Sequence, residues 1–423
     1  MSSPNDRPTL TRPVVLLLTS TFLAATAALA GVTALGKLVY DLTDSELALG
    51  FLGLAEFLPA LLLMLVVGAV ADRLDRRKVT GAAGCVEAAI ALLLAAYVAT
   101  DPTSATPIFG LVLGFGITRA FLAPASRSLP ADIVPPSRLP WLVARNSITW
   151  QASIIVGPVL GGILYSVDPA LPFAVMAGLL FCASAAVLAI PFDDVVQIDD
   201  PLVEAAVEPA LGHSTAEEGT SLREAMLGFR FIRRQPVLLG AISLDLFAVL
   251  FGGAVALLPA IAEDRLGAGA VGLGWLRAAG GIGAALVTIV LAFRPVQRHV
   301  GRVLLVAVAL FGAVTVVLGA TRSYVVAFIA LAVLAGADSV SVFVRATLVP
   351  LATPPELRGR VLAVENVFIG GSNELGAFES GVAGQLLGAP AAIVLGGAAT
   401  IVIAGAWWLA FPDLKDVDRF PQP

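Results

Sequence analysis

The chain has 423 residues, of which 58% are apolar and only 13% are charged, and its net charge is −5. Because a water-soluble protein needs far more charge to cover its surface, this composition excludes a soluble fold. Two histidines and two cysteines, the cysteines both inside apolar runs, offer neither a zinc site nor a disulfide framework. We therefore expect a membrane protein that uses no metal and no cofactor.

Apolar segments of about 20 residues, the length that a helix needs to cross the hydrocarbon core, follow one another along the chain. They predict an all-α membrane protein with twelve transmembrane helices. The predicted spans are residues 13–37, 47–71, 79–99, 107–128, 142–166, 170–191, 237–261, 270–293, 302–320, 323–348, 361–386 and 389–411.

The basic residues in the connections predict the orientation. Of the 26 Lys and Arg residues, only Arg265 and Arg322 fall in connections on one side. Four lie within spans: Lys37, Arg119, Arg277 and Arg345. The other 20 fall on the opposite side, which the positive-inside rule assigns to the cytoplasm. Both termini are predicted to be cytoplasmic in a multi-pass protein of a bacterial plasma membrane.

A pattern of Arg, Pro-Pro and Asn occurs twice at an offset of 218 to 220 residues. Its members are Arg127, Pro135, Pro136 and Asn146, then Arg345, Pro354, Pro355 and Asn366. The two copies fall at spans four-to-five and ten-to-eleven, as a six-plus-six duplication requires. We expect a tail at 1–12, six-helix bundles at 13–191 and 237–411, a linker at 192–236 and a tail at 412–423.

The predicted linker has two parts. Residues 192–220 carry eight acidic residues and no Lys or Arg, which is typical of a flexible segment. Leu222, Met226, Phe229 and Ile232 then recur at helical spacing, with arginines off that stripe. This amphipathic helix either lies on anionic headgroups or packs under the bundle.

The cytoplasmic connection after the second span reads Gly68-Ala-Val-Ala-Asp-Arg-Leu-Asp-Arg-Arg-Lys78 and resembles the signature loop of the major facilitator superfamily. Twelve spans and a duplicated half strengthen the resemblance, which implies two pseudo-symmetric bundles and a transporter that functions as a monomer. Further stretches resemble the bacterial enterobactin-exporter-like branch: 119–125, 245–253, 272–279, 359–361 and 372–375.

The resemblance implies that this loop is a conformational latch, in which Asp72 contacts the start of span eleven in the outward-open state. Gly68 leaves room for helices to approach closely, and the arginines hold the loop in the cytoplasm. These arginines are Arg73, Arg76 and Arg77. Asp75 stands where the family usually has a glycine. A plain positive-inside anchor is the alternative interpretation.

A second motif in span five resembles the antiporter motif of exporters in this family. It consists of Gly157, Pro158, Gly161 and Gly162. Proline kinks a helix by removing a backbone donor, and the glycines would let the other half pack against the bend. Ala144 and Ser153 occupy places where the full pattern has glycine. The motif favours export; a structural kink is the alternative.

Charged residues inside the spans are the candidates for a transport path, since each needs a partner or water. In the family, spans 1, 4, 7 and 10 line the cavity, spans 2, 5, 8 and 11 join the halves, and the others face lipid. On this mapping only Glu87 faces lipid. The predicted path residues are Arg119, Asp245, Arg277, Asp338 and Glu374. Structural ion pairs, such as Asp338 with Arg345 seven residues later, are the alternative.

A proton-coupled exporter is the predicted function. Glu374 or Asp338 would carry the proton, and an approaching arginine such as Arg119 would release it. The resemblance points to siderophores, drugs or similar amphipathic metabolites as substrate, with lipids but no nucleic acid as other partners. An importer or uniporter is the alternative. No zinc, phosphate-loop or nucleophile motif indicates an enzyme, and no filter or charged ring indicates a channel.

Overall fold

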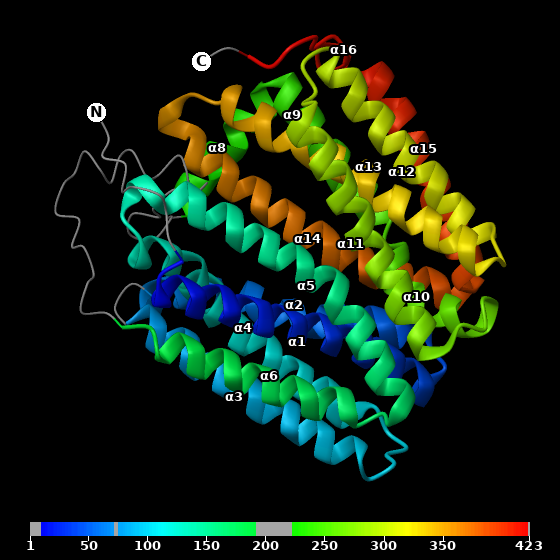
Figure 1. The fold of residues 1–423 in the computed structure, drawn as a ribbon. Coiled ribbons are helices and arrows are strands. Elements are labelled where there is room, and N and C mark those ends of the chain that lie inside the picture. Colours follow the sequence, from blue (N-terminus) through cyan, green and yellow to red (C-terminus); the bar gives the residue numbers. More distant parts are fainter. Residues whose placement is uncertain (1–9, 72–74, 192–221, 422–423) are drawn as a thin grey trace. The chain divides into compact units, whose positions relative to one another are not determined.

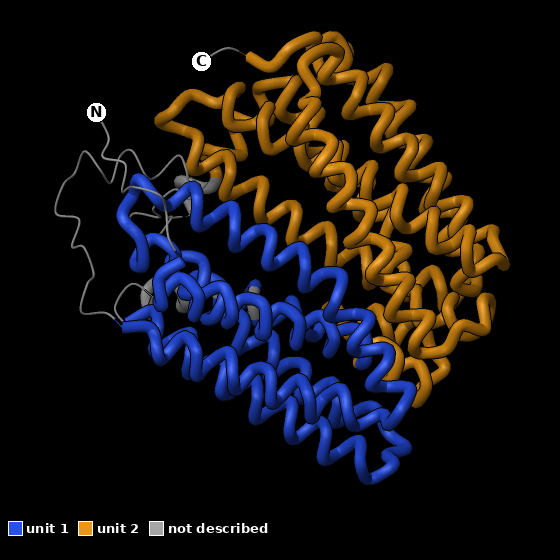
Figure 2. Tube along the Cα trace, in the orientation of Figure 1, with its two compact units in different colours: residues 1–34, 55–215 blue, residues 35–54, 216–423 orange. Residues whose placement is uncertain are grey.

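The computed structural model describes residues 10–71, 75–191 and 222–421, with the side chains of residues 60, 64–71 and 222–225 left out. Within these ranges the regular structure is helical, and no strand occurs there (Figure 1). Contacts between Cα atoms divide the chain into two compact units (Figure 2). The first contains residues 1–34 and 55–215, and the second contains residues 35–54 and 216–423.

In its described residues, the first unit is built from six long helices and one short 3-10 turn. They are α1 (Arg12–Thr43), α2 (Glu46–Ala71), α3 (Arg76–Val98), α4 (Thr106–Ile133), η1 (Pro136–Arg138), α5 (Leu139–Val167) and α6 (Leu171–Leu188). The end of α1 and the start of α2 belong to the second unit instead. The hydropathy pattern does not indicate that exchange, because both segments read as ordinary parts of spans.

The second unit contains the remaining elements. They are α8 (Leu222–Arg234), α9 (Pro236–Phe251), η2 (Ala254–Leu257), α10 (Leu258–Ala260), η3 (Ile261–Arg265), α11 (Gly269–Phe293), α12 (Val300–Ala320), α13 (Tyr324–Leu351), α14 (Pro355–Leu387), α15 (Ala389–Ala410) and α16 (Pro412–Lys415). The elements between Pro236 and Arg265 form one broken span, in which η3 is a π-helical turn.

Eleven stretches among the described residues are long and apolar enough to cross a membrane. The other long helix, α14, has 33 residues but carries several charged groups. A charged helix of this length must be covered by protein or water rather than by lipid. Each of the twelve predicted spans overlaps one of these twelve segments, so the structure confirms the predicted all-α membrane architecture.

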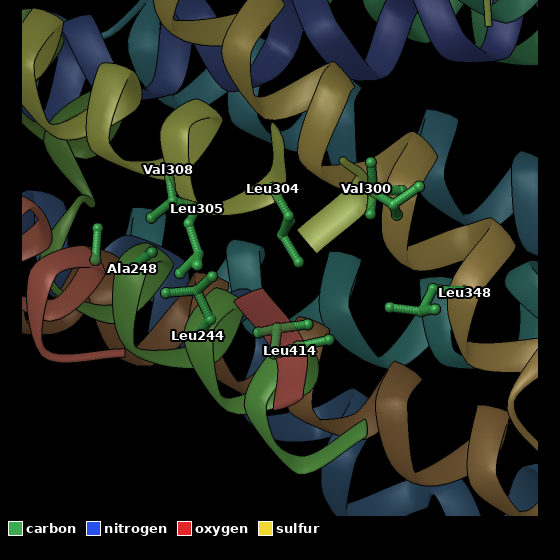
Figure 3. Packing of buried hydrophobic residues seen from close by; sticks show 11 residues of the cluster. Leu244, Ala248, Val300, Leu304, Leu305, Val308, Leu348 and Leu414 are labelled. Atoms are coloured by element: carbon green, nitrogen blue, oxygen red, sulfur yellow. The ribbon is translucent and has the colours of Figure 1, made fainter. Parts of the chain in front are cut away.

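Apolar side chains between neighbouring helices form the core of each unit. In the second unit, Leu244 and Ala248 of α9 pack with Leu304 and Val308 of α12 and with Leu348 of α13 (Figure 3). In the first unit the corresponding cluster joins four helices. Its buried members are Val14, Leu17, Leu129, Leu142, Val187 and Ile190. These cores hold in place the helices that carry the interior charges.

The amphipathic helix α8 combines features of both interpretations. Ile232 is buried, and Gly228 lies so close to α14 that a Cβ there would be 2.7 Å from the Arg360 carbonyl oxygen. Met226 and Leu227 are exposed. The helix therefore packs against its unit on one side and presents apolar side chains outward on another, as an interfacial helix does.

Candidate functional site

The first charged cluster in the membrane interior surrounds Arg119 of α4. Arg119 forms a close ion pair with Glu56 of α2, and its Nε lies 3.5 Å from Glu87 Oε1 of α3. Glu87 is only 2% exposed, and its Oε1 accepts no hydrogen bond in the described structure. One cation and two carboxylates therefore meet inside the first unit. We call Arg119, Glu56 and Glu87 the Arg119 cluster.

Glu87 is the functional candidate that the sequence analysis missed, because the family mapping placed it on a lipid-facing helix. In the structure it lies on the packed face of α3, together with Gly84 and Ala91. Small residues spaced about one helical turn apart mark the packed face of a membrane helix. That spacing was the available signal, and it places Glu87 toward protein.

The second charged cluster surrounds Arg345 of α13. Its Nη2 lies 2.8 Å from Asp245 Oδ1 of α9, and its Nη1 lies 3.4 Å from Glu365 Oε1 of α14. The three side chains are only 6%, 7% and 8% exposed. We call Arg345, Asp245 and Glu365 the Arg345 cluster. Like the first cluster, it holds one cation between two carboxylates on different helices.

Asp338 was predicted to be a possible ion-pair partner of Arg345, but Arg345 pairs with Asp245 and Glu365 instead. Asp338 lines a small cavity with Asp245 and Ser341. Ser341 is 3% exposed, and its Oγ has no hydrogen-bond partner among the described residues. The rest of the lining is apolar. Asp338 therefore lies next to the Arg345 cluster, on a cavity that also exposes the polar side chains of Asp245 and Ser341.

Lys37 of α1 is also held by carboxylates. It forms an ion pair with Asp41 one turn later, and its Nζ lies 3.1 Å from Glu263 Oε2 of η3. Its neighbour Tyr40 donates a hydrogen bond to Asp264. All these residues belong to the second unit. The end of α1 is thereby fastened to the π-helical turn at the end of the broken span.

The remaining path candidates, Arg277 and Glu374, lie on α11 and α14. Arg277 Nε is buried and makes no hydrogen bond within the described ranges. A Cβ added to Gly36 would lie 3.5 Å from Arg277 Nη2. Glu374 is half-buried, and its Oε2 occupies space that a Cβ at Gly53 of α2 would enter at 2.8 Å.

The signature loop is only partly described. Asp72 and Arg73 lie outside the described residues, and Gly68 lies in the last part of α2, where only the backbone is described. Arg76 forms an ion pair with Asp132 of α4 at 3.1 Å. Arg77 Nη1 donates to the Ile190 carbonyl oxygen at 2.6 Å. Both arginines thus connect the start of α3 to other parts of the first unit, Arg76 to α4 and Arg77 to the segment just after α6.

Asp75, which stands where the resemblance has a glycine, is the N-cap of α3. Its Oδ1 accepts a hydrogen bond from the Arg77 backbone N at 3.0 Å, and its Oδ2 lies 3.2 Å from Arg77 Nη2. Burial acts to raise the pKa of this carboxyl, but the hydrogen bonds from Arg77 bring the pKa below its usual value. The extra charge therefore has a local role in starting the helix.

The kink motif lies in the middle of α5, where Pro158 sits inside the helix. A Cβ on Gly157 would lie 2.7 Å from Leu29 Cβ, and a Cβ on Gly161 would lie 2.4 Å from the Ala30 carbonyl oxygen. The two glycines therefore allow α5 to contact α1 within the first unit, and the expected contact with the other half stays a prediction. Gly162 is buried as well.

Eleven membrane-length stretches of the described chain, with two clusters of paired charges among its helices, define a polytopic membrane protein. The chain belongs to the transmembrane secretion effector family, whose model matches residues 10–422. A comparison with curated proteins gives no match. Within the described residues, no group of His, Cys, Asp and Glu side chains is placed to hold a metal ion.

Solved transporter structures share the fold. The nucleoside transporter NupG matches with a TM-score of 0.70 and 15% identity, covering 95% of this chain and 99% of that one. A bacterial homologue of the human lysosomal transporter Spinster, inward-facing and unoccupied, matches with 0.69 and 15%, covering 97% and 98%. A peptide-bound POT family transporter matches with 0.70 and 12%, covering 95% and 96%. The chain is a membrane transporter of the major facilitator type, and not an enzyme.

Proposed function

We propose that the protein is a secondary active exporter of a bacterial plasma membrane, with both termini in the cytoplasm. It moves a small amphipathic molecule, such as a siderophore, a drug or a related metabolite, by alternating access, and it works as a monomer. The observation that carries this proposal is the placement of charge inside each unit. Arg119 and Arg345 are each held between two carboxylates on separate membrane helices. A bundle whose only task is to fold has no need of such costly groups.

Export is the proposed direction. The family is described as one of secretion effectors, and the motif in α5 resembles that of exporters. The glycines of this motif allow α5 to pack tightly on α1, so a change at the bend would be passed to α1. The signature loop, with Gly68, Asp72, Arg73, Arg76 and Arg77, would act as the latch between conformations. The resemblance to the enterobactin-exporter-like branch supports a siderophore as one candidate cargo.

Proton exchange is the proposed coupling. Asp338 and Glu374 are the candidate carriers, and Asp338 shares a small cavity with Asp245 and Ser341, the polar groups that a bound water would bridge there. Each returning proton supplies about 2.3 kcal/mol per 100 mV of membrane potential, which is sufficient to drive export. Asp245, beside the same cavity, would sense the protonation state of Asp338 through its charge.

The decisive experiment deletes the gene and compares small molecules inside and outside the cell. We expect the cargo to accumulate inside the deletion strain, and the wild-type gene to restore its release. Genes carrying Asp72→Asn, Arg119→Gln or Asp338→Asn should fail to restore it. Depletion of the compound from the deletion strain would instead indicate an importer.

Reconstituted protein tests the coupling separately. In vesicles with an imposed pH gradient we expect the identified cargo to be concentrated on one side, and collapse of the gradient should abolish that accumulation. Equal movement with and without the gradient would remove the proton from the proposal and leave a uniporter. Accumulation against a concentration difference also separates a carrier from a channel.

A further inference from the structure

Arg277 differs from the other cations inside the spans. Lys37, Arg119 and Arg345 are each held by two carboxylates. For Arg277 no ion pair and no hydrogen bond is found within the described structure. Its place in α11 is eight residues after the first residue, Gly269, or about 12 Å along the helix at about 1.5 Å per residue. It is therefore well inside the span.

An arginine in this position is costly to keep. The guanidinium stays charged at every physiological pH and presents five N–H donors, so water-poor surroundings without an acceptor are unfavourable. Membrane proteins rarely retain such groups except along the path of a substrate or an ion. The other three interior cations show how this chain satisfies a basic group with its own carboxylates. Arg277 has no such carboxylate partner among the described residues.

The residues found against the Arg277 guanidinium are small and uncharged. Gly36 of α1 lies against the guanidinium, and Pro259 of α10 lies against Gly36. Neither side chain carries charge, and neighbours on the buried side of α11 include Gly274, Ala278 and Gly281. A larger residue at position 36 would approach Nη2 closely. This small, neutral wall offers the guanidinium no side-chain acceptor, so a bound ligand would have to supply one.

We propose that Arg277 binds the anionic group of the transported molecule, so the cargo is an amphipathic oxyanion: a carboxylate, sulfonate or phosphate. The planar fork of the guanidinium makes two parallel hydrogen bonds to such a group, and these bonds strengthen where water is scarce. This inference rests on the proposed export function and adds the charge class of the cargo. Binding supplies the acceptors that the empty carrier lacks.

The first test reads the charge of the cargo in living cells. A deletion strain is complemented with the wild type, Arg277→Gln, Arg277→Lys or Arg294→Gln, the last removing an exposed arginine at the end of the same helix. We expect the compounds whose release depends on the wild type to be anions at neutral pH. Their release should fall at least tenfold with Arg277→Gln, fall less with Arg277→Lys, and stay unchanged with Arg294→Gln.

Two results of this test would overturn the inference while leaving export intact. They are release of neutral or cationic compounds only, and normal release of anions by Arg277→Gln. A complete lack of protein-dependent release is a different result, because it removes the proposed export function and this inference together.

The second test needs no knowledge of the cargo. The purified, full-length variants are melted in detergent without any added ligand. A residue kept for binding should add nothing to the stability of the empty carrier, so Arg277→Gln should melt at the wild-type temperature or above it. Arg345→Gln, which removes a paired arginine, should melt several degrees lower. If Arg277→Gln lowers the melting temperature as Arg345→Gln does, Arg277 is structural and the inference fails.

Discussion

The Arg119 cluster of the first unit and the Arg345 cluster of the second combine the same charges in different surroundings. Each places one arginine between two carboxylates from neighbouring helices. In the Arg345 cluster all three side chains are at most 8% exposed. In the Arg119 cluster the arginine is 27% and Glu56 is 32% exposed, and only Glu87 is sealed at 3%.

This difference in access separates two uses of the same arrangement. A sealed cluster cannot exchange ions with water unless its helices move, and it fixes those helices through contacts that are costly to break. A partly exposed cluster can be reached from outside its helices without such a movement, while one of its carboxylates stays in low dielectric. The Arg345 cluster is therefore expected to matter most for stability, and the Arg119 cluster most for transport.

The largest expected effect comes from Arg345→Gln. The change leaves Asp245 and Glu365 facing each other without their cation, and breaking a buried pair in this way costs about 3–5 kcal/mol. We expect a large fall in melting temperature in detergent and a low yield of folded protein. Adding Asp245→Asn and Glu365→Gln should recover most of the loss, because the cluster then contains no unpaired charge. A wild-type melting curve for the single variant would contradict the structural role.

Arg119→Gln should reduce export strongly and stability only a little, the reverse of Arg345→Gln. Because Arg119 and Glu56 are partly exposed, water replaces some of the lost contact, and the expected destabilisation is roughly 1–2 kcal/mol. Export should nevertheless fall at least tenfold. The measurement pairs a melting curve with release of the cargo. Arg119→Gln and Arg345→Gln with the same melting temperature would show that exposure does not distinguish the clusters.

Glu87→Gln should change the stability less than Arg119→Gln does. Arg119 keeps Glu56, and the glutamine removes a buried charge whose oxygen accepts no hydrogen bond from the described residues. We expect stability to change by about 1 kcal/mol at most, in either direction. If Glu87 exchanges protons during the cycle, a pH gradient should no longer drive accumulation of cargo in vesicles that contain Glu87→Gln. Glu56→Gln is the matched variant, and it should lower the stability more, because it removes the closer ion-pair partner of Arg119.

The helices were predictable because the bilayer imposes a length and a composition that a single sequence displays. Their ends were less so. Helix α1 continues to Thr43, beyond the predicted end at residue 37, since Lys37 finds Asp41 on the next turn and Glu263 on another element. A hydropathy pattern places the end of a span at such charged residues. The helix can nevertheless continue beyond them when they have polar partners, as Lys37 does.

The partners of the interior charges were much less predictable than their positions. The spacing along α13 suggested Asp338 for Arg345, but the actual partners come from α9 and α14. A sequence gives the face of a helix on which a residue lies, whereas the neighbour across that face depends on how helices pack. Glu87 was misplaced for the same reason, because a family-wide rule for lipid-facing helices does not describe each face of α3.

The smallest expected effect concerns Asp75, a carboxylate that meets an arginine at the start of α3, outside the membrane-length helices. The Asp75 and Arg77 side chains are 27% and 19% exposed, so this pair shows what the same chemistry contributes near water. Loss of the N-cap in Asp75→Ala should cost about 1 kcal/mol, and Asp75→Asn less, since asparagine also caps.

The pH dependence of this contribution has a definite sign. The folded pKa of Asp75 is lowered, so its charge stabilises the folded state above the unfolded pKa of about 3.9, and that contribution is lost as the pH falls through the folded value. The melting temperatures of wild type and Asp75→Asn should therefore differ at pH 7 and converge in acid below about pH 4. A difference that grows on acidification would mean that the charge of Asp75 opposes folding. The partly exposed Asp75–Arg77 pair would then destabilise the folded state, whereas the buried Arg345 pairs are expected to stabilise it.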